Sequence, residues 1–467
     1  MKREFLRRSL VNTYKVAELI NISAPNLSIR VEPSEGGTIL YLPIAAKTAN
    51  DKAAAEVCLE LVIQNNSNAG VHLNQVAISF SAPPAVNSVS IPVSLDIGPN
   101  ASAEWNFDTS NDIFLPFPPP ASLKLSLSCD GFSNPAAFDF PLAAYHASSP
   151  GGSYLFPTET ALFSTGEFWQ GQSGTHGAGA YGSQLFAYDL GVVAFDPVNM
   201  NWSGLLPGTT GTKNEDFRIW GKPVCAVADG VVLEAVNDVP NNPHPLQWTS
   251  QADLNQQLNQ QEMNYWGSYP NGGAGHHFYI QHGEEVVLYA HMQKGTLTQN
   301  LLPTGSLVKA GDKLGVAGNA GNSTAPHLHI HAIKGTQPES GPLRPLPFHG
   351  ILAIDTTAAA IPYPESPWTT VQGQGLPDVP SLIWPGTAWG TLSNKGIYQL
   401  AIDPLALILR SDIYVLLTLP DPPPIEVLER QVQTMVKAMA PAERKRVLER
   451  AEALMVYVQA LRRELQG

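Results

Sequence analysis

The alternation of hydrophobic and polar residues predicts that the first third of the chain is built from β-strands. Between residues 25 and 147, apolar side chains recur at every second position, which is the period of a strand with one buried face. The clearest runs are 27–31, 57–63, 76–80, 89–95 and 123–129. Clusters of Asn, Gly, Pro and Ser separate these runs, as expected for turns. Short strands at this spacing favour an immunoglobulin-like β-sandwich.

The pattern of strands and turns continues from residue 154 to about residue 350 and then changes twice. A Gly-, Ser- and Pro-rich stretch at 146–153 predicts a boundary between the sandwich and a second domain. Residues 351–423 are rich in Pro and have no pattern that we can assign. Over 424–467, apolar residues recur at helical spacing on both sides of Pro441, which predicts a short C-terminal helical hairpin. The fold class expected is therefore mainly β, with this hairpin available for docking or self-association.

The first 24 residues begin with basic side chains, as a signal peptide does. The apolar stretch that should follow is interrupted by Asn12, Lys15 and Glu18. We therefore expect a short amphipathic segment over 1–24 and no cleaved signal. The chain also has no run of 18 apolar residues, so no transmembrane helix is predicted.

Composition and charge narrow the class of protein. Hydrophobic residues make up 43% of the chain and charged residues 14%, which fits a folded protein with a sizeable core. The formal net charge of −13 argues against a nucleic-acid partner, because phosphate binding needs clustered Lys and Arg. Three cysteines do not describe a disulfide framework. Cys129 follows the alternation of its strand, whereas Cys58 is out of step and should face away from the sandwich core.

Candidate chemistry is concentrated in the histidines of the second domain. In the segment PHLHIH, His327 and His329 are two positions apart, so on a strand they would share one face about 7 Å apart. His331 would lie on the same face, either as a further participant or as a strand-end residue. His291 ends the apolar run VVLYAH. The stretch 237–275 is rich in Asn and Gln and long for a connection, so it could form the wall of a substrate groove.

Four blocks of sequence, taken in order, resemble the M23 family of zinc metallopeptidases, the lysostaphin- and LytM-like peptidoglycan endopeptidases. They are PVCAVADGVV from residue 223, YAHM from 289, VKAGDKLGVAGNAGNS from 308 and PHLH from 326. The resemblance covers roughly residues 170–335. It implies an antiparallel β peptidase domain at about 154–350, a Zn²⁺ cofactor, and a peptide substrate in peptidoglycan cross-links or stem peptides.

The resemblance also implies roles for three histidines. His329, the second histidine of the pair, corresponds to a zinc ligand. His327 and His291 correspond to the non-ligand histidines that orient the attacking water and stabilise the tetrahedral oxyanion. A site with three protein ligands leaves the fourth tetrahedral position to water, as hydrolysis requires.

The other two ligands implied by the family are a histidine and an aspartate that precede the first block. His176, in GTHG, is the natural candidate for the histidine. Many members place the aspartate four residues later, where this chain has Ala180. Other members resemble a longer-spaced version ending in a strand such as LFAYDL, and Asp189 fits that version. Asp196 is the alternative, but at seven positions from Asp189 it would face the opposite side of one strand.

The function expected is a zinc-dependent endopeptidase. The main alternative is a catalytically inactive M23-like binding or regulatory module, although such relatives usually lack ligand or catalytic histidines. A lipoyl- or biotinyl-like carrier is suggested by the hairpin at 308–315 but would need an exposed lysine at a turn. An adhesion or scaffold protein would leave the histidines unexplained. The sequence indicates a cytoplasmic protein, whereas a cell-wall substrate would require an extracytoplasmic one.

Overall fold

The computed structural model describes residues 20–21, 27–35, 38–49, 51–83, 85–107, 113–116, 118–130, 132, 134–158, 167–172, 184–196, 201–266, 271–338, 341–356 and 369–385. These residues are mainly β-strand and contain one α-helix, α2 (Gln251–Trp266), which confirms the mainly β class. The C-terminal segment 424–467 and most of the segment 1–24 lie outside the described residues, so their predicted conformations stay predictions. Among the described residues, no helix is both long and apolar enough to span a membrane.

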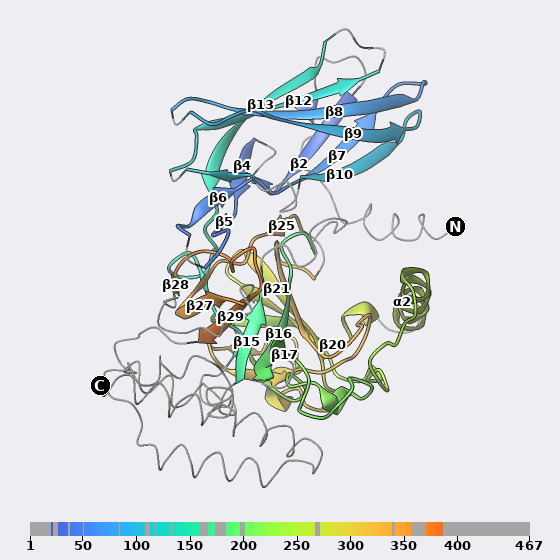
Figure 1. Cartoon of the computed structure of the whole chain (residues 1–467), viewed down its shortest axis with the longest axis vertical. Coiled ribbons are helices and arrows are strands. Elements are labelled where there is room, and N and C mark those ends of the chain that lie inside the picture. The colour runs from blue at the N-terminus through green and yellow to red at the C-terminus, as the bar shows by residue number, and fades with distance from the viewer. Residues whose placement is uncertain are drawn as a thin grey trace, which may run out of the picture.

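The N-terminal strands form two sheets around a common core (Figure 1). One sheet has four strands, in the order β1 (Ile20–Asn21), β2 (Leu27–Glu32), β7 (Leu59–Asn65) and β10 (Ser102–Phe107). The other has six, in the order β3 (Ser34–Glu35), β4 (Ile39–Leu42), β13 (Ala136–Ala144), β12 (Ser122–Cys129), β8 (Val71–Phe80) and β9 (Val89–Ile97). Each of the five predicted apolar runs overlaps one of these strands. Ile29, Leu61 and Leu125 are buried in the shared core because alternate side chains of each strand point inward.

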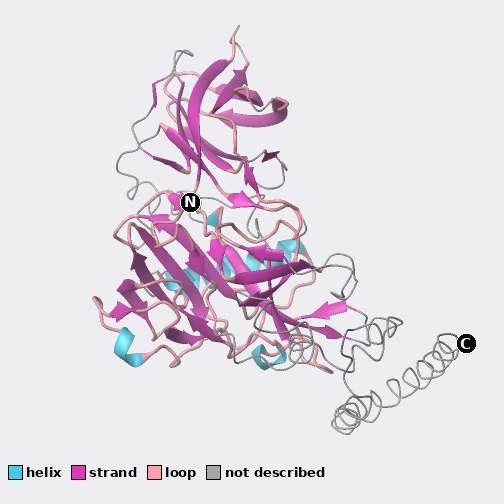
Figure 2. Ribbon diagram, turned by 90° about the vertical axis from the view of Figure 1, so that its left-hand side faces the viewer, coloured by secondary structure: helices cyan, strands magenta, loops and turns pink. Residues whose placement is uncertain are grey.

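The largest sheet among the described residues has twelve strands and lies in the lower body of Figure 2. Its main path follows the order β22 (Leu307–Val308), β19 (Gly230–Val236), β20 (His276–His282), β21 (Glu285–Met292), β24 (Leu328–Lys334), β16 (Tyr188–Asp196), β15 (Glu167–Gly171), β29 (Ser381–Pro385), β27 (Ile351–Asp355) and β28 (Thr369–Val371). β17 (Asn201–Ser203) pairs with β16, and β25 (Leu343–Arg344) pairs with β24. The neighbouring strands of this sheet are antiparallel.

The remaining strands form small sheets beside these two bodies. They are β5 (Ile44–Ala45), β6 (Ala54–Glu56) and β11 (Phe114–Leu115) in one, β14 (Tyr154–Leu155) and β26 (Phe348–His349) in a second, and β18 (Pro223–Cys225) and β23 (Lys313–Val316) in a third.

Both faces of the large sheet are buried at its centre. Every residue of β21 is buried, with Val287 and Tyr289 in the main core on one face and Leu288 and Ala290 in a smaller cluster on the other. Burial on both faces explains why this strand has a nearly continuous apolar sequence and no alternation. The sequence pattern gave no assignment for 351–423, yet three strands of this sheet, β27, β28 and β29, lie there.

The sandwich contacts the large sheet through both apolar and charged side chains. Cys58, which is out of step with its strand, packs against Leu185, Phe186 and Leu343 and not into the sandwich core. This confirms that Cys58 faces away from that core. On the same side, the Lys334 ammonium lies 2.6 and 2.7 Å from the two carboxylate oxygens of Glu35.

Candidate metal centre

Neighbouring strands place an aspartate and two histidines on one face of the sheet. Asp189 of β16 is directly opposite His329 of β24, and paired residues of antiparallel strands point to the same side. Their side chains therefore meet, with Asp189 Oδ1 2.9 Å from His329 Nδ1. His327 precedes His329 by two residues, and its Nε2 lies 3.4 Å from the same Asp189 oxygen.

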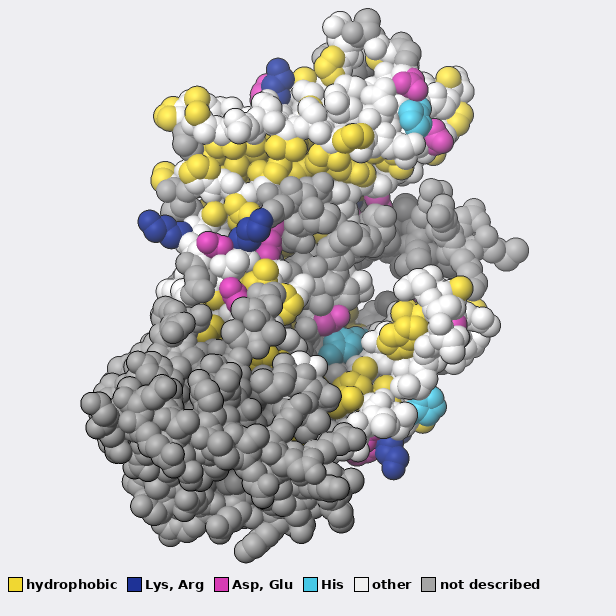
Figure 3. Space-filling view, in the orientation of Figure 1, with side chains coloured by type: hydrophobic (Ala, Val, Ile, Leu, Met, Phe, Trp, Pro, Cys, Tyr) yellow, Lys and Arg dark blue, Asp and Glu magenta, His cyan; other side chains and the backbone are white. Residues whose placement is uncertain are grey.

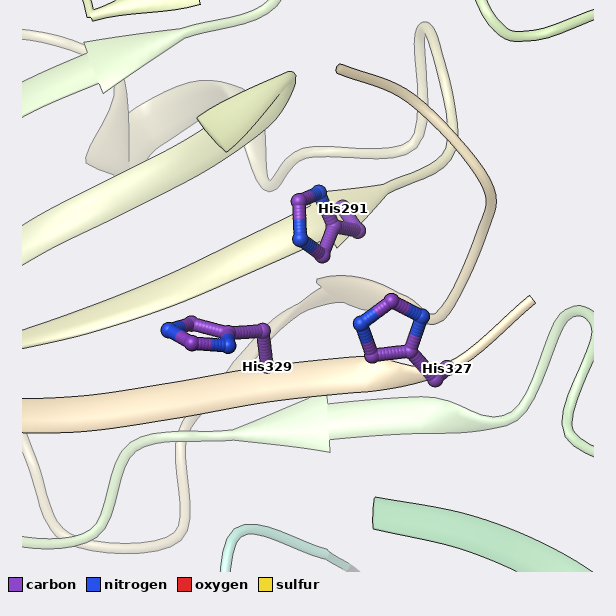
Figure 4. A group of neighbouring side chains, drawn as sticks. All are labelled: His291, His327 and His329. Atoms are coloured by element: carbon purple, nitrogen blue, oxygen red, sulfur yellow. The ribbon is translucent and has the colours of Figure 1, made fainter. Parts of the chain in front are cut away.

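His291 reaches this group because of a bulge in β21. Ala290 is paired with His329 and shares its face, so in a regular strand the next residue would point away. At this position Ala290 and His291 together oppose His277 alone, and the backbone of His291 is left-handed, with φ of 63°. A bulge of this kind re-aims a side chain. The ring centre of His291 lies 4.7 Å from that of His327 and 5.7 Å from that of His329 (Figure 4).

The three histidines form a compact, mostly buried cluster. One ring nitrogen from each of His291, His327 and His329 lies within 4.8 Å of the other two. His291 and His329 are buried, whereas the side chains of His327 and Asp189 keep 18% and 29% of their exposure. The site is therefore reached from one side, and Figure 3 shows histidine and carboxylate side chains in a hollow beside α2.

Hydrogen bonds to backbone carbonyls fix two of the imidazole rings. His291 Nδ1 lies 2.7 Å from Ala320 O, and His327 Nδ1 lies 2.8 Å from Ala325 O. A carbonyl oxygen only accepts, so each Nδ1 carries the hydrogen and each neutral ring has its lone pair on Nε2. A lone pair on His327 Nε2 would face the Asp189 carboxylate directly. This arrangement is stable only if a proton or a cation lies between them.

The pKa values of the two histidines move in opposite directions. Burial, followed by the neighbouring His327 and His329, lowers the pKa of His291 well below its usual value, so its ring is neutral near pH 7. Burial also acts to lower the pKa of His327, but the charge and hydrogen bond of Asp189 outweigh it and leave that pKa raised. One neutral and one readily charged imidazole therefore face the same space.

The loop that supplies both carbonyls is held by buried amide side chains. Asn242 Nδ2 donates to Asn319 Oδ1 at 3.2 Å, and Asn242 Oδ1 accepts a hydrogen bond from the Tyr265 hydroxyl of α2 at 2.7 Å. Gln261 of the same helix donates to Ser323 O at 3.1 Å. The helix α2 thus braces the loop that orients His291 and His327.

Close backbone packing holds the same loop from the other side. The loop lies against the 3₁₀ turn η4 (Gly272–Ala274), and a Cβ at Gly275 would come within 2.3 Å of Ala320 O. That oxygen is the acceptor for His291. At Gly321 a Cβ would come within 2.4 Å of the backbone of Gly275. Glycine is required at both positions, because any side chain would displace this carbonyl.

Four of the residues singled out from the sequence meet at this site, namely Asp189, His291, His327 and His329. Asp196 does not meet them, because it is opposite Asn201 at the far end of β16, about 23 Å from Asp189 along the strand. The predicted ligand His176 lies outside the described residues. The bracing by α2 and Asn242 was not predicted. In the sequence, this bracing was indicated only by the length and the Asn and Gln content of the stretch 237–275.

Comparisons with known proteins match part of the region that holds these residues. Residues 263–340 match the family model described as peptidase family M23, a range that begins after Asp189. An uncharacterized metalloprotease of Haemophilus influenzae is 40% identical over 63 residues, a match that spans 13% of this chain and 12% of that relative's length.

Two solved structures are similar over longer ranges but at low identity. The catalytic domain of the antimicrobial peptidase lysostaphin from Staphylococcus simulans is 22% identical and covers 30% of this chain and 84% of its own, with a TM-score of 0.17. A zinc-containing peptidase from Vibrio cholerae is 12% identical and covers 74% of this chain and 93% of its own, with a TM-score of 0.21. The segment that holds His291, His327 and His329 therefore matches peptidase family M23.

Proposed function

We propose that this protein is a zinc-dependent endopeptidase whose metal is held by Asp189, His329 and His176. The observation that carries the proposal is the convergence of Asp189 Oδ1, His329 Nδ1 and His327 Nε2, at 2.9 and 3.4 Å from the shared carboxylate oxygen. Two ligands of one tetrahedral zinc ion are about 3.3 Å apart, and nitrogen and carboxylate donors suit this ion. His176 enters as the third ligand from the sequence resemblance alone.

Bound zinc would supply Lewis acidity for the scissile carbonyl and lower the pKa of the attacking water. The protein's own groups then handle the protons. His291 has a neutral ring whose Nε2 lone pair can accept the proton of the attacking water. His327, when protonated beside Asp189, can donate a hydrogen bond from Nε2 to the carbonyl oxygen as negative charge develops there.

The substrate we propose is a peptide bond in peptidoglycan cross-links or stem peptides. Support comes from the family resemblance, and a substrate of this kind would place the protein outside the cytoplasm. We also propose that the sandwich, at about 25–147, is an immunoglobulin-like binding module attached to a peptidase domain at about 154–350. The segment 424–467 is proposed as a helical element for docking or self-association.

The test is a cleavage assay on purified peptidoglycan and on soluble peptides, with fragments identified by mass. Zinc-loaded protein should release fragments, removal of zinc with a chelator should stop the release, and added zinc should restore it. Zinc-loaded protein that cleaves none of these substrates would contradict the proposal and favour an inactive binding or regulatory module.

A further inference from the structure

His331 lies directly behind His329 on the same face of β24. Its Nδ1 is 2.9 Å from His329 Nε2, and the ring planes are nearly perpendicular, at 83°. His331 is 3% exposed and is opposite Leu288 of β21, which belongs to the apolar cluster on this face. The contact between the two rings is therefore shielded from water. In such surroundings a hydrogen bond is strong, and a tautomer that cannot form it is unfavourable.

His329 uses its two ring nitrogens in the reverse order from the other histidines of the site. His291 and His327 turn Nδ1 to a backbone carbonyl, and Nε2 of His327 faces Asp189. In His329 it is Nδ1 that faces Asp189, while Nε2 faces away, towards His331. A nitrogen that binds a cation presents its lone pair, so the hydrogen of a neutral His329 ring must then be on Nε2.

We propose that His331 is a positioning residue for the metal ligand His329. His331 Nδ1 accepts the hydrogen of His329 Nε2, which fixes both the ring angle and the tautomer that frees Nδ1 for the metal. This inference rests on the proposed zinc site at Asp189 and His329. It gives a role to the third alternating histidine that follows the pair.

The variants His331→Asn and His331→Leu test this role by separating hydrogen bonding from packing. The Asn side-chain oxygen lies as far from the backbone as His Nδ1, so it can accept the same hydrogen, whereas Leu fills similar space with no acceptor. Zinc affinity is measured by competition with a chromogenic chelator, and the ligand geometry by the absorption spectrum of the Co²⁺-loaded protein. We expect Leu to weaken zinc binding about 10- to 100-fold and to alter the spectrum, and Asn to restore most of both.

His282→Asn is the matched control, because His282 is also a buried histidine of the same sheet, but it contacts Asp229 O and the Tyr289 hydroxyl. It should change stability without changing zinc affinity. If the Leu variant does not fold, His331→Gln replaces it, since its amide lies one bond further out, and it should show the same weakening.

Equal zinc affinity in all His331 variants, or equal loss in Leu and Asn, would overturn the role of His331. A wild-type protein that binds no zinc would instead overturn the proposed function on which this inference rests, so the two failures are distinguishable.

Discussion

At the scale of single residues, His291 combines a proposed catalytic role with an unfavourable backbone conformation. Its left-handed conformation, with φ of 63°, costs a residue with a Cβ about 1–2 kcal/mol, and glycine avoids this cost. We predict that His291→Gly is more stable than His291→Ala by about 1 kcal/mol, measured by urea denaturation. Equal stability of the two variants would show that the bulge relaxes when the imidazole is lost.

The same position gives the most direct test of a catalytic role. Because His291 is not among the proposed ligands, His291→Ala should keep its zinc and lose turnover by about 100- to 10,000-fold, the usual contribution of a general base. Turnover and zinc content are measured on the same preparation. Unchanged turnover would refute the role of His291, and loss of zinc would move it into the ligand set.

The residues of the site were predicted from the sequence to different degrees. Spacing placed His327 and His329 on one face, because strand periodicity is a local property. The pairing of Asp189 with His329 depends on which strands become neighbours, and the sequence indicated it only through a family resemblance. The direction of His291 depends on a bulge that strand alternation cannot show. The sequence left His331 open, because its role is seen only in the contact between two rings.

At the scale of elements, the helix α2 and the buried amides hold the loop that orients two histidines. Asn242 is 4% exposed, and Asn242→Ala would remove one hydrogen bond from Asn319 and one from the Tyr265 hydroxyl. Losing hydrogen bonds between buried polar groups costs about 2 kcal/mol, so we predict a loss of that size in the free energy of unfolding, lower turnover and unchanged zinc content.

The matched control is Asn264→Ala on the exposed side of the same helix, where Asn264 accepts a hydrogen bond from Gln260. An exposed amide contributes little, so the change in stability should be under about 0.5 kcal/mol. Equal losses of stability and turnover in the two variants would show that the buried amide hydrogen bonds do not hold the loop.

Strands with one buried face were predicted well from the sequence, and the other elements were predicted poorly. Alternation identified the sandwich strands because their outer faces are polar. The helix α2 was expected only as a long loop, since a sequence of mostly Gln and Asn has no apolar stripe. The strands β27, β28 and β29 were missed because Pro-rich connections interrupt them and each is short, with bounds Ile351–Asp355, Thr369–Val371 and Ser381–Pro385.

At the scale of the whole molecule, a buried carboxyl group accepts hydrogen bonds from the segment that follows the sandwich in the chain. Glu285 of β21 is 3% exposed and accepts hydrogen bonds from the backbone of Ser148, at 3.1 Å, and from the Tyr154 hydroxyl. Burial raises its pKa from 4.5 to about 7, although the nearby Arg344 and Lys334 act to lower it. The folded protein therefore binds a proton here that the unfolded chain releases above about pH 4.5.

The sign of the resulting pH dependence follows from this raised pKa. The stability associated with protonated Glu285 is fully present below pH 4.5 and is lost as the pH rises through about 7. The full difference is on the order of 3 kcal/mol. We predict that Glu285→Gln, which stays neutral, gains stability relative to wild type as the pH is raised from 5 to 8, measured by urea denaturation at each pH.

Glu284→Gln is the control for this measurement, because Glu284 is adjacent but its side chain is 77% exposed. It should follow the wild-type pH dependence closely. If the free energies of unfolding of wild type and Glu285→Gln changed with pH in parallel, Glu285 would titrate near its ordinary pKa and would not make the stability of this contact depend on pH.

We propose that Asp189 and His329 hold a zinc ion, and the zinc content of purified protein is the first measurement to make. Elemental analysis after dialysis would compare wild type with Asp189→Asn and with Asp196→Asn, a matched change on the same strand about 23 Å away. We predict about one zinc per chain in wild type and in Asp196→Asn, and loss of zinc in Asp189→Asn. Zinc retained at the wild-type level by Asp189→Asn, or absent from wild type after reloading, would contradict it.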